Sequence, residues 1–397
     1  MKVHNDRNCS ICGSKEKYLL LQQNFTRISD INLVDHYDIN VCKDCGFCFA
    51  DKIPEQDDFD RYYKEMSKYE KFDLNAKESA SDVKRFKAVV TYIEEVLENK
   101  SAKIVEIGCA NGLLLSMLKD NDYDNLLGVD PSPVCVDTAI KKYKIPAVTG
   151  TLANISVEDE SVDCLILVGV LEHVRDLNES LIRLHKLLKN RGKLIIGVPD
   201  ASKYFEGKDA PFQEFSLEHI NFFGPGSLVN LVKQNGFSVI NLNQVLLEVN
   251  SNTYVPVILS TFIKENDSAI DNQVIEDRIT IKNLKQYIKK SDNHEKRILR
   301  KISTIIQNQE PVLIWGTGAL TLRLLGNTEL CKANICAFVD SNPKYQGRSI
   351  NRVPIISPNS LIGRNEVILI STWAFQNEIE LQIKNVLKLK NRIIKLY

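Results

Sequence analysis

Short apolar runs alternate with helical patterns through the middle of the chain. Residues 104–107 and 164–168 are almost wholly apolar, as expected for strands buried on both faces of a parallel sheet. Apolar residues at helical spacing follow the first run, at Leu114, Met117 and Leu118. Strands that alternate with helices predict a doubly wound α/β fold. Further strands are expected to end at Val129, Val148 and Val198.

A glycine turn separates the first strand from its helix. Gly108 and Gly112 allow the backbone to pass close to a ligand, where a Cβ would block the approach. Asp130 ends the next strand, where an acid is placed to accept two hydrogen bonds from a ribose diol. Glu106 stands two residues before the first glycine, which departs from the dinucleotide pattern. A nucleotide-type ligand is therefore predicted, with a dinucleotide oxidoreductase or a ligand-free βαβ unit as alternatives.

The pattern Glu106-x-Gly108-x-x-x-Gly112 resembles motif I of class I S-adenosylmethionine (SAM) methyltransferases. The resemblance implies that SAM is the cofactor and that it lies along the ends of successive strands. It also implies that the turn after the third strand lies beside the adenine ring. The residues expected to bind SAM are Glu106, Gly108, Gly112, Asp130, Pro131, Thr151, Leu152 and Val168.

The segment after the fourth strand, Leu171-Glu172-His173-Val174, has two readings. The same resemblance places it near the amino-acid part of SAM and the entrance for the acceptor. Alternatively, Glu172 and His173 only cap the helix that follows.

Two Cys-x-x-Cys pairs stand near the start of the sequence, Cys9 with Cys12 and Cys42 with Cys45. Each pair supplies two sulfurs from one tight turn, so together they predict a closed tetrahedral Zn²⁺ site with a structural role. Ten cysteines in a chain without a secretion signal argue against a disulfide framework. Free buried thiols are the alternative.

Composition narrows the class of protein. The 397 residues are enough for two or three domains. Lys and Arg together number 51, as do Asp and Glu, so no net charge favours nucleic acid or a membrane surface. The longest apolar run, Cys164 to Leu171, is too short to span a bilayer, and the sequence begins without the apolar run of a signal peptide. We therefore expect a cytoplasmic protein without nucleic-acid or membrane partners, and its oligomeric state is open.

An aromatic loop follows the strand that ends at Val198. Residues 212–225 contain four phenylalanines and the adjacent pair Glu218-His219. Loops at the carboxyl ends of α/β strands form the binding crevice. Because histidine titrates near neutral pH, it is suited to act as a general base. We expect His219 to be catalytic with Glu218 beside it; the alternative is that His219 only binds the acceptor or braces the loop.

Residues 61–69 are dense in tyrosine, with Tyr62, Tyr63 and Tyr69. These side chains either pack against the fold or cover a ligand, with one phenol reaching the chemistry. The sequence leaves both possibilities open.

A second strand–glycine–helix unit begins near residue 311. Residues 312–315 lead into Gly316-Thr317-Gly318, and Asp340 ends the next apolar run. Since a lone Gly-x-Gly is a weak motif, a substrate-binding or structural role is favoured over a second nucleotide cofactor. Three domains are expected: a zinc-binding module (1–60), a SAM-dependent methyltransferase domain (61–245) and a Rossmann-like substrate-binding domain (246–397).

These three blocks together resemble the deoxysugar C-methyltransferase family, which acts on nucleotide-diphosphate ketosugars. The resemblance rests on the cysteine pairs, on Glu218-His219 and on a C-terminal run. That run contains Asp340-Ser341-Asn342-Pro343, Gln346-Gly347-Arg348 and Trp373-x-Phe375.

The family's mechanism is then implied for this chain. The sugar ketone acidifies the neighbouring C–H bond, the residue matched by His219 removes the proton, and the resulting carbon nucleophile takes the SAM methyl group. Glu218 would orient the imidazole.

Two departures from the family pattern change the expectation. Ser216 stands where the family usually has a tyrosine, and Gly318 is followed by Ala319-Leu320-Thr321 rather than a Pro-Ala-Lys-Gly type of run. The alternatives are therefore an O-methyltransferase acting on a glycan or small metabolite, and a non-catalytic protein that binds a nucleotide-type ligand.

Overall fold

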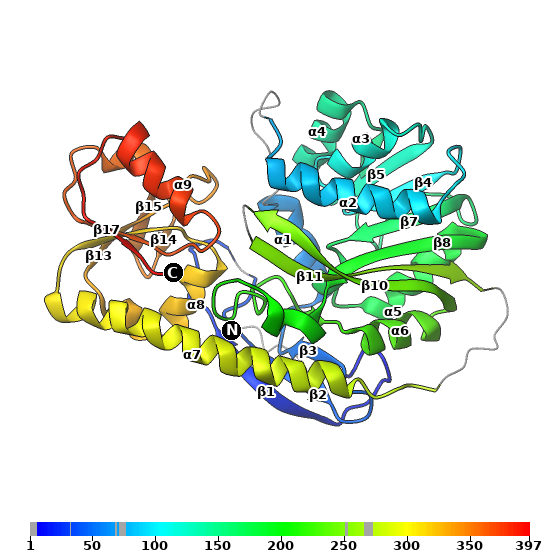
Figure 1. Cartoon of the computed structure of the whole chain (residues 1–397), viewed down its shortest axis with the longest axis horizontal. Helices are drawn as coiled ribbons and strands as arrows, with labels where there is room; N and C mark the ends of the chain where they lie inside the picture. Colours follow the sequence, from blue (N-terminus) through cyan, green and yellow to red (C-terminus); the bar gives the residue numbers. More distant parts are fainter. Residues whose placement is uncertain (1–5, 32, 68–69, 71–76, 251–252, 266–272) are drawn as a thin grey trace. The chain divides into compact units, whose positions relative to one another are not determined.

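The computed structural model describes all residues except 1–5, 32, 68–69, 71–76, 251–252 and 266–272 (Figure 1). Tyr69 therefore lies outside the described residues. The chain forms two compact units. The first comprises Met1–Leu19, Asn40–Gly207 and Glu218–Leu284, and the second comprises Leu20–Ile39, Lys208–Leu217 and Lys285–Tyr397.

The first unit is built on a seven-stranded sheet. Its order is β10-β11-β8-β7-β4-β5-β6. Strands β8, β7, β4, β5 and β6 run parallel to one another. Strand β11 pairs antiparallel with both β8 and β10. The strands are β4 (Ile104–Ile107), β5 (Leu126–Asp130), β6 (Ala147–Thr149), β7 (Val162–Val168), β8 (Leu188–Pro199), β10 (Phe237–Asn250) and β11 (Thr253–Lys264).

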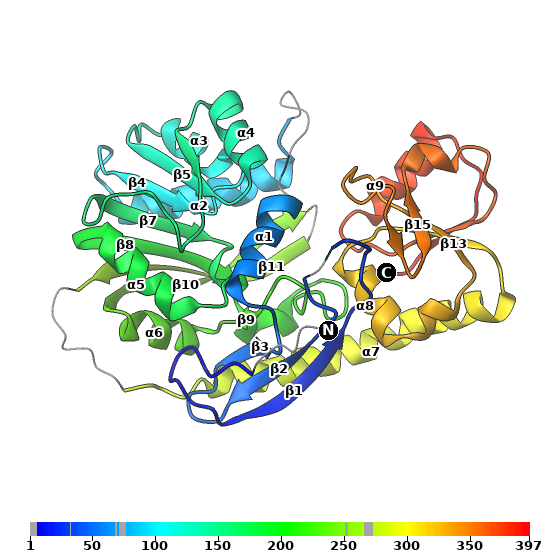
Figure 2. The same cartoon turned by 180° about the vertical axis from the view of Figure 1, so that it is seen from behind.

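Helices cover both faces of this sheet, as Figures 1 and 2 show from opposite sides. One group lies on one face and the other group on the opposite face, which confirms the predicted doubly wound α/β fold. The first group is α2 (Ala80–Val96), α3 (Leu113–Lys119) and α4 (Pro133–Tyr143), and the second is α5 (Leu177–Leu187) and α6 (Pro225–Gln234).

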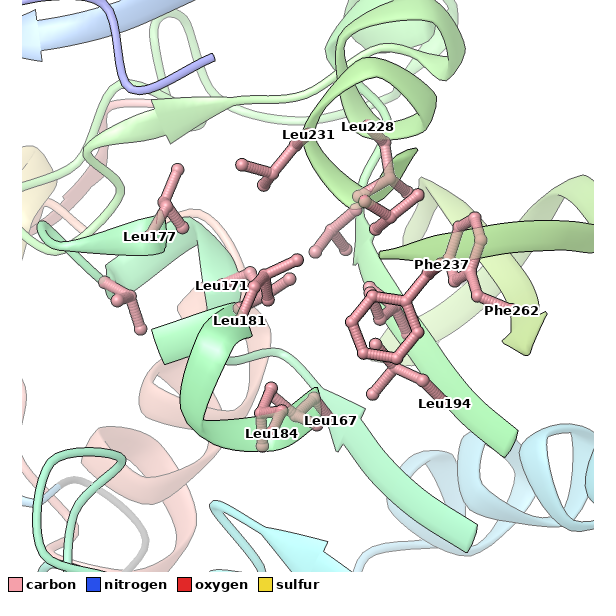
Figure 3. Close-up of a cluster of buried hydrophobic side chains, with 14 of the residues drawn as sticks. Leu167, Leu171, Leu177, Leu181, Leu184, Leu194, Leu228, Leu231, Phe237 and Phe262 are labelled. Atoms are coloured by element: carbon pink, nitrogen blue, oxygen red, sulfur yellow. The ribbon is translucent and has the colours of Figure 1, made fainter. Parts of the chain in front are cut away.

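The apolar runs fill two separate cores because successive strand residues point to opposite faces. Ile104 and Ile166 belong to a core with α2 and α3. Val105 and Leu167 belong to the other, with α5 and α6. Figure 3 shows the second core, where the helix side chains meet β7, β8 and the antiparallel strands. The labelled side chains are Leu167, Leu171, Leu177, Leu181, Leu184, Leu194, Leu228, Leu231, Phe237 and Phe262.

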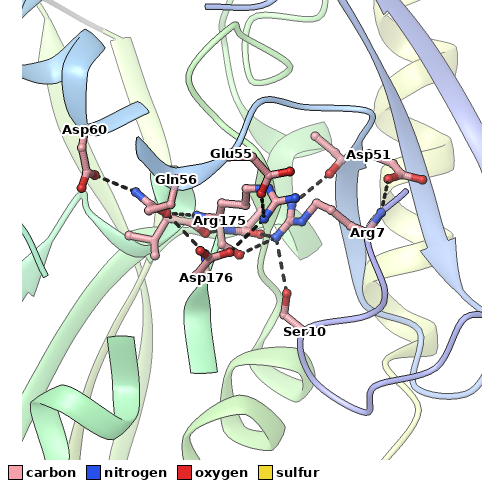
Figure 4. Close-up of polar contacts among 11 residues, drawn as sticks. Arg7, Ser10, Asp51, Glu55, Gln56, Asp60, Arg175 and Asp176 are labelled. Atoms are coloured by element: carbon pink, nitrogen blue, oxygen red, sulfur yellow. Dashed lines mark hydrogen bonds and ion pairs between the residues drawn. The ribbon is translucent and has the colours of Figure 1, made fainter. Parts of the chain in front are cut away.

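A four-stranded sheet carries the N-terminal cysteine pairs. Its order is β1 (Lys17–Asn24), β2 (His36–Cys42), β3 (Cys48–Asp51) and β9 (Asn221–Phe222). Buried Arg7 donates to the carbonyl oxygens of Ala50 at 2.9 Å and Arg175 at 2.9 Å, and its backbone N–H donates to Asp51 (Figure 4). Hydrogen bonds thus join the N-terminal segment to the loop after β7.

Helix α1 (Gln56–Met66) follows this sheet. The Gln56 amide oxygen accepts the backbone N–H groups of Arg175 at 2.8 Å and Asp176 at 3.3 Å. Glu55 pairs with the Arg175 guanidinium at 2.7 Å, so the start of α1 is fixed to the same loop (Figure 4).

The second unit contains a six-stranded sheet whose central strands are parallel. The order is β14 (Ser349–Ile350), β15 (Val353–Ile356), β13 (Ile335–Val339), β12 (Val312–Trp315), β16 (Val367–Ile370) and β17 (Ile393–Lys395). The helices are α8 (Ala319–Asn327) and α9 (Gln376–Leu381). The long helix α7 (Arg278–Asn308) precedes β12.

Two further observations concern the chain as a whole. The hairpin β10–β11 extends the seven-stranded sheet past residue 245 to Lys264. Among the described residues, no helix combines the length and the apolar character needed to cross a bilayer.

Candidate active site

The residues expected to bind SAM lie along one edge of the seven-stranded sheet. Because β4, β5, β6 and β7 are parallel, their carboxyl ends meet at this edge. The expected residues stand at or just after these ends. They are Glu106, Gly108 and Gly112 at β4, Asp130 and Pro131 at β5, Thr151 and Leu152 at β6, and Val168 at β7.

Glu106 places a buried carboxyl group in this crevice. Its side chain is 3% exposed, and Oε2 has no hydrogen-bond partner among the described residues. Burial, and then the nearby Asp130, raise the pKa of Glu106 to about 8. Oδ1 of buried Asn111 also lacks a partner within the described part of the chain. These two buried oxygens fit SAM, because its ammonium and ribose hydroxyl groups are donors and a nearby cation favours the ionised, accepting form of Glu106.

Asp130 is held by the backbone on both sides. Its Oδ2 accepts the Ala110 N–H at 2.8 Å, and its Oδ1 accepts the Ser132 N–H at 2.9 Å. Burial raises the pKa of Asp130 to about 6, although these two hydrogen bonds oppose the rise. Each carboxylate oxygen keeps a further lone pair, so the fixed group remains able to accept hydroxyl groups.

The two glycines of the loop have positive φ angles, +74° at Gly108 and +82° at Gly112. A Cβ added at Gly108 would lie 2.6 Å from Cγ2 of Val170, and one at Gly112 would lie 2.8 Å from Cβ of Ala139. The fold therefore requires both glycines, in addition to the close ligand approach predicted from the sequence.

The turn after β6 is tied to α1. Thr151 donates its backbone N–H to Oδ1 of Asn154 at 2.6 Å. Asp60 on α1 accepts from Nε2 of Gln56 at 2.8 Å and is also hydrogen-bonded by the side chain of Thr151. Helix α1 thus brings a carboxylate to the end of β6.

Histidines and tyrosines gather beyond the end of β7. Nδ1 of His173 lies 2.8 Å from the Glu218 carbonyl oxygen and 3.0 Å from the Tyr63 hydroxyl oxygen. Because a carbonyl only accepts, Nδ1 of His173 carries a proton. The rings of His173 and His219 meet edge to face, with centroids 5.0 Å apart.

Two carboxylates belong to this cluster. Oε1 of Glu218 accepts the Tyr62 hydroxyl at 3.1 Å. Buried Glu172 has a carboxylate oxygen within 4.8 Å of ring nitrogens of both His173 and His219. Glu172 is therefore an additional candidate for stabilising an imidazolium at His219, the role that the family resemblance gives to Glu218 alone.

The four predicted zinc ligands come together. Their sulfurs lie within 4.8 Å of one another, and Sγ–Sγ distances are 3.4 Å for Cys9–Cys45 and for Cys12–Cys42. Tetrahedral Zn²⁺ at about 2.3 Å from each sulfur requires separations of about 3.8 Å. The cluster thus fits a metal with a small adjustment.

In the second unit, the glycine loop is hydrogen-bonded to Asp340, the acid at the end of the next strand. Oδ2 of Asp340 accepts the N–H of Thr317 at 3.0 Å and its hydroxyl at 2.5 Å, and Oδ1 accepts the Asn342 N–H at 2.8 Å. The hydroxyl of Thr317 is a third donor to this carboxylate, which leaves it less capacity for a ribose. This bonding favours the substrate-binding or structural role.

The sequence predicts no site role for Asp60, and it leaves open whether Tyr63 packs or covers a ligand and whether His173 only caps a helix. Each of the three contacts a segment distant in sequence: Asp60 contacts Thr151, Tyr63 contacts His173, and His173 contacts the Glu218 carbonyl oxygen. Tyr63 is marked by the tyrosine-rich stretch and His173 by the Glu172-His173 pair after a buried strand, whereas Asp60 has no sequence signal.

Two regions of the chain match models of known protein families. Residues 81–242 match the family model described as a methyltransferase domain. Residues 308–394 match the one described as C2185-like, N-terminal. Residues 81–242 therefore form a methyltransferase domain of the SAM-dependent type.

Individual relatives match parts of the chain. A demethylmenaquinone methyltransferase of Thermotoga maritima is 24% identical over 171 residues, covering 37% of this chain and 75% of that protein. A ubiquinone biosynthesis O-methyltransferase of Rickettsia bellii is 26% identical over 106 residues, covering 25% and 43%. A Mycolicibacterium smegmatis protein, named a probable SAM-dependent methyltransferase, is 24% identical over 137 residues, or 34% of this chain; the match spans about half, 52%, of its length.

Among solved structures, a SAM-dependent methyltransferase of Methanosarcina mazei aligns with a TM-score of 0.38 and 16% identity. The alignment covers 44% of this chain and 98% of that one.

Proposed function

We propose that the protein is a SAM-dependent methyltransferase that methylates a nucleotide-activated ketosugar on the carbon next to its ketone, with His219 as general base. The observation that carries the proposal is the group formed by His219, His173, Glu172 and Tyr63, which lies beyond β7 at the sheet edge that holds Glu106. A base beside the buried carboxyl group of Glu172 suits proton abstraction better than simple binding.

The cofactor would be held by Asp130 and Glu106, with the glycine loop beneath it. SAM supplies an electrophilic methyl group when bound. Proton removal and the stabilisation of charge are carried out by side chains of this protein, and the acceptor supplies the nucleophilic carbon.

His219 takes the proton from the carbon beside the ketone, and the negative charge of Glu172 stabilises the imidazolium that forms. As charge develops on the ketone oxygen, the hydroxyl group of Tyr63 is the nearby donor to stabilise it, whereas the hydroxyl of Tyr62 already donates to Glu218. Tyr63 would compensate for Ser216, which replaces the tyrosine expected from the family resemblance. His173 is a positioning residue, fixed by the Glu218 carbonyl oxygen.

We further propose that Zn²⁺ binds the four cysteines as a structural ion, that the second unit binds the nucleotide part of the acceptor, and that the protein acts in the cytoplasm. The zinc proposal is supported by the sulfur separations, and the acceptor proposal by the family resemblance of residues 339–379.

Proton abstraction is tested separately from methyl transfer. The protein is incubated in deuterium oxide with demethylated cofactor, S-adenosylhomocysteine, and a panel of nucleotide ketosugars. We expect the hydrogen beside the ketone to exchange in the wild type, exchange to be lost in His219→Gln, and exchange to persist in the control His36→Gln. His36 is a partly exposed histidine paired with Asp35.

Ser216 favours one competing function, an O-methyltransferase, because a phenol near the ketone is missing at that position. In that case a methyl group would reach a sugar hydroxyl without any exchange at carbon. Such a result would refute the general-base assignment while leaving methyl transfer intact.

A further inference from the structure

The position of the adenine ring follows from the sheet order, if the proposed function holds. β7, β4, β5 and β6 are adjacent in that order. The ribose belongs at Asp130 on β5, and the reactive end of the cofactor must face the histidines beyond β7. The base therefore extends the other way, over the end of β6, where the chain forms the turn of Gly150 and Thr151.

One carboxylate reaches this turn, and it comes from outside the sheet. Asp60 on α1 is hydrogen-bonded by the side chain of Thr151. Nε2 of Gln56 donates to its Oδ1 at 2.8 Å (Figure 4). A carboxylate accepts about four hydrogen bonds, so Asp60 retains capacity for a further donor.

The carboxylate is also held in place. The Gln56 amide that binds Asp60 is itself fixed, because its oxygen accepts the N–H groups of Arg175 and Asp176. Arg175 is in turn paired with Glu55. An acceptor fixed by such a chain of contacts pays little entropy when it binds a ligand.

We propose that Asp60 selects the base of the cofactor by accepting a hydrogen bond from the 6-amino group of adenine. A carboxylate only accepts, so a base with a carbonyl oxygen at position 6 would face it with a second acceptor and be rejected. Helix α1 thereby forms part of the cofactor site, although it lies outside the matched methyltransferase domain, residues 81–242.

The test compares two ligands that differ only at this position. Binding of S-adenosylhomocysteine and of its hypoxanthine counterpart, S-inosylhomocysteine, is measured by calorimetry at pH 8. The wild type is expected to prefer the adenine form by about tenfold or more, the range of one charged hydrogen bond. In Asp60→Asn the side chain gains an N–H donor, so the preference should disappear or reverse.

Asp57→Asn is the matched control, because Asp57 is an exposed acid on the same helix. It should keep the wild-type ratio. If Asp60→Asn keeps the wild-type ratio, or weakens both ligands equally, the inference is wrong. A wild-type ratio near one overturns it even if the variant does not fold. Failure of the wild type to bind either ligand would instead refute the proposed function.

Discussion

Because the carboxyl group of Glu106 is buried, we expect it to make the free energy of unfolding depend on pH. Glu106→Gln keeps the shape of the side chain but removes its ability to ionise. In the folded protein burial raises the pKa of Glu106 from 4.5 to about 8. At about 1.4 kcal/mol for each pKa unit, this rise corresponds to roughly 5 kcal/mol.

The direction follows from proton linkage. The folded state binds the proton more tightly than the unfolded state. The stability that protonated Glu106 contributes is therefore complete below pH 4.5 and is lost as the pH rises through 8. At pH 7 the loss is about 3 kcal/mol. A glutamine does not titrate, so the variant escapes this loss.

Thermal unfolding of cofactor-free protein at pH 5 and pH 8 provides the assay. At pH 8 we expect Glu106→Gln to melt roughly 10 °C above the wild type, since each kcal/mol shifts the midpoint by about 2–4 °C in a unit of this size. At pH 5 the two should nearly coincide. Glu98→Gln, at an exposed glutamate, is the control and should match the wild type at both values.

A variant that is no more stable than the wild type at pH 8, or a difference that does not change with pH, would refute this reasoning. The same variant should bind S-adenosylhomocysteine more weakly, because the acceptor at the cofactor is altered. A gain in stability with a loss of affinity would show that the buried acid is retained for binding.

Other consequences are tested by single changes. His219→Gln should lower kcat by about 10²–10⁴-fold with unchanged affinity for S-adenosylhomocysteine, and an unchanged kcat would reduce the residue to a structural role. Removal of metal by a strong chelator, or Cys45→Ser, should lower the melting temperature in proportion to the zinc lost; a protein that contains no zinc by elemental analysis contradicts the proposed site. Gly112→Ala should cost about 1–3 kcal/mol of unfolding free energy, because φ is +82° and the new Cβ would lie 2.8 Å from Cβ of Ala139. Chemical denaturation checks this value, and an undiminished stability would show that the loop relaxes freely.

The sheet that carries the methyltransferase domain was predictable because its strands obey simple patterns. The runs ending at Ile107, Val129 and Val168 are apolar on both faces except at Glu106, and the apolar residues of the helices between them recur at helical spacing. The hairpin of β10 and β11 was not predicted. Its strands mix polar residues and Pro256 with apolar ones, which is typical of an antiparallel sheet edge and gives a weak signal.

The candidate site was predictable only in part, for a related reason. Glu106, Asp130 and the cysteine pairs belong to local motifs, so the residues next to them in the sequence are enough to predict their roles. Asp60 and His173 acquire their surroundings through contacts with residues far along the chain, such as the bond from Thr151 to Asp60 and the bond between His173 and the Glu218 carbonyl oxygen. Such contacts depend on how the chain folds, so a short stretch of sequence does not predict them.

The most direct test of the proposed activity is the carbon skeleton of the product. The zinc-loaded protein is incubated with SAM carrying ¹³C in its methyl group and with nucleotide ketosugars, and the product is examined by NMR. The account predicts a labelled methyl group bonded to the sugar carbon beside the ketone. A label bonded to oxygen, or no transfer to any nucleotide ketosugar, would contradict it.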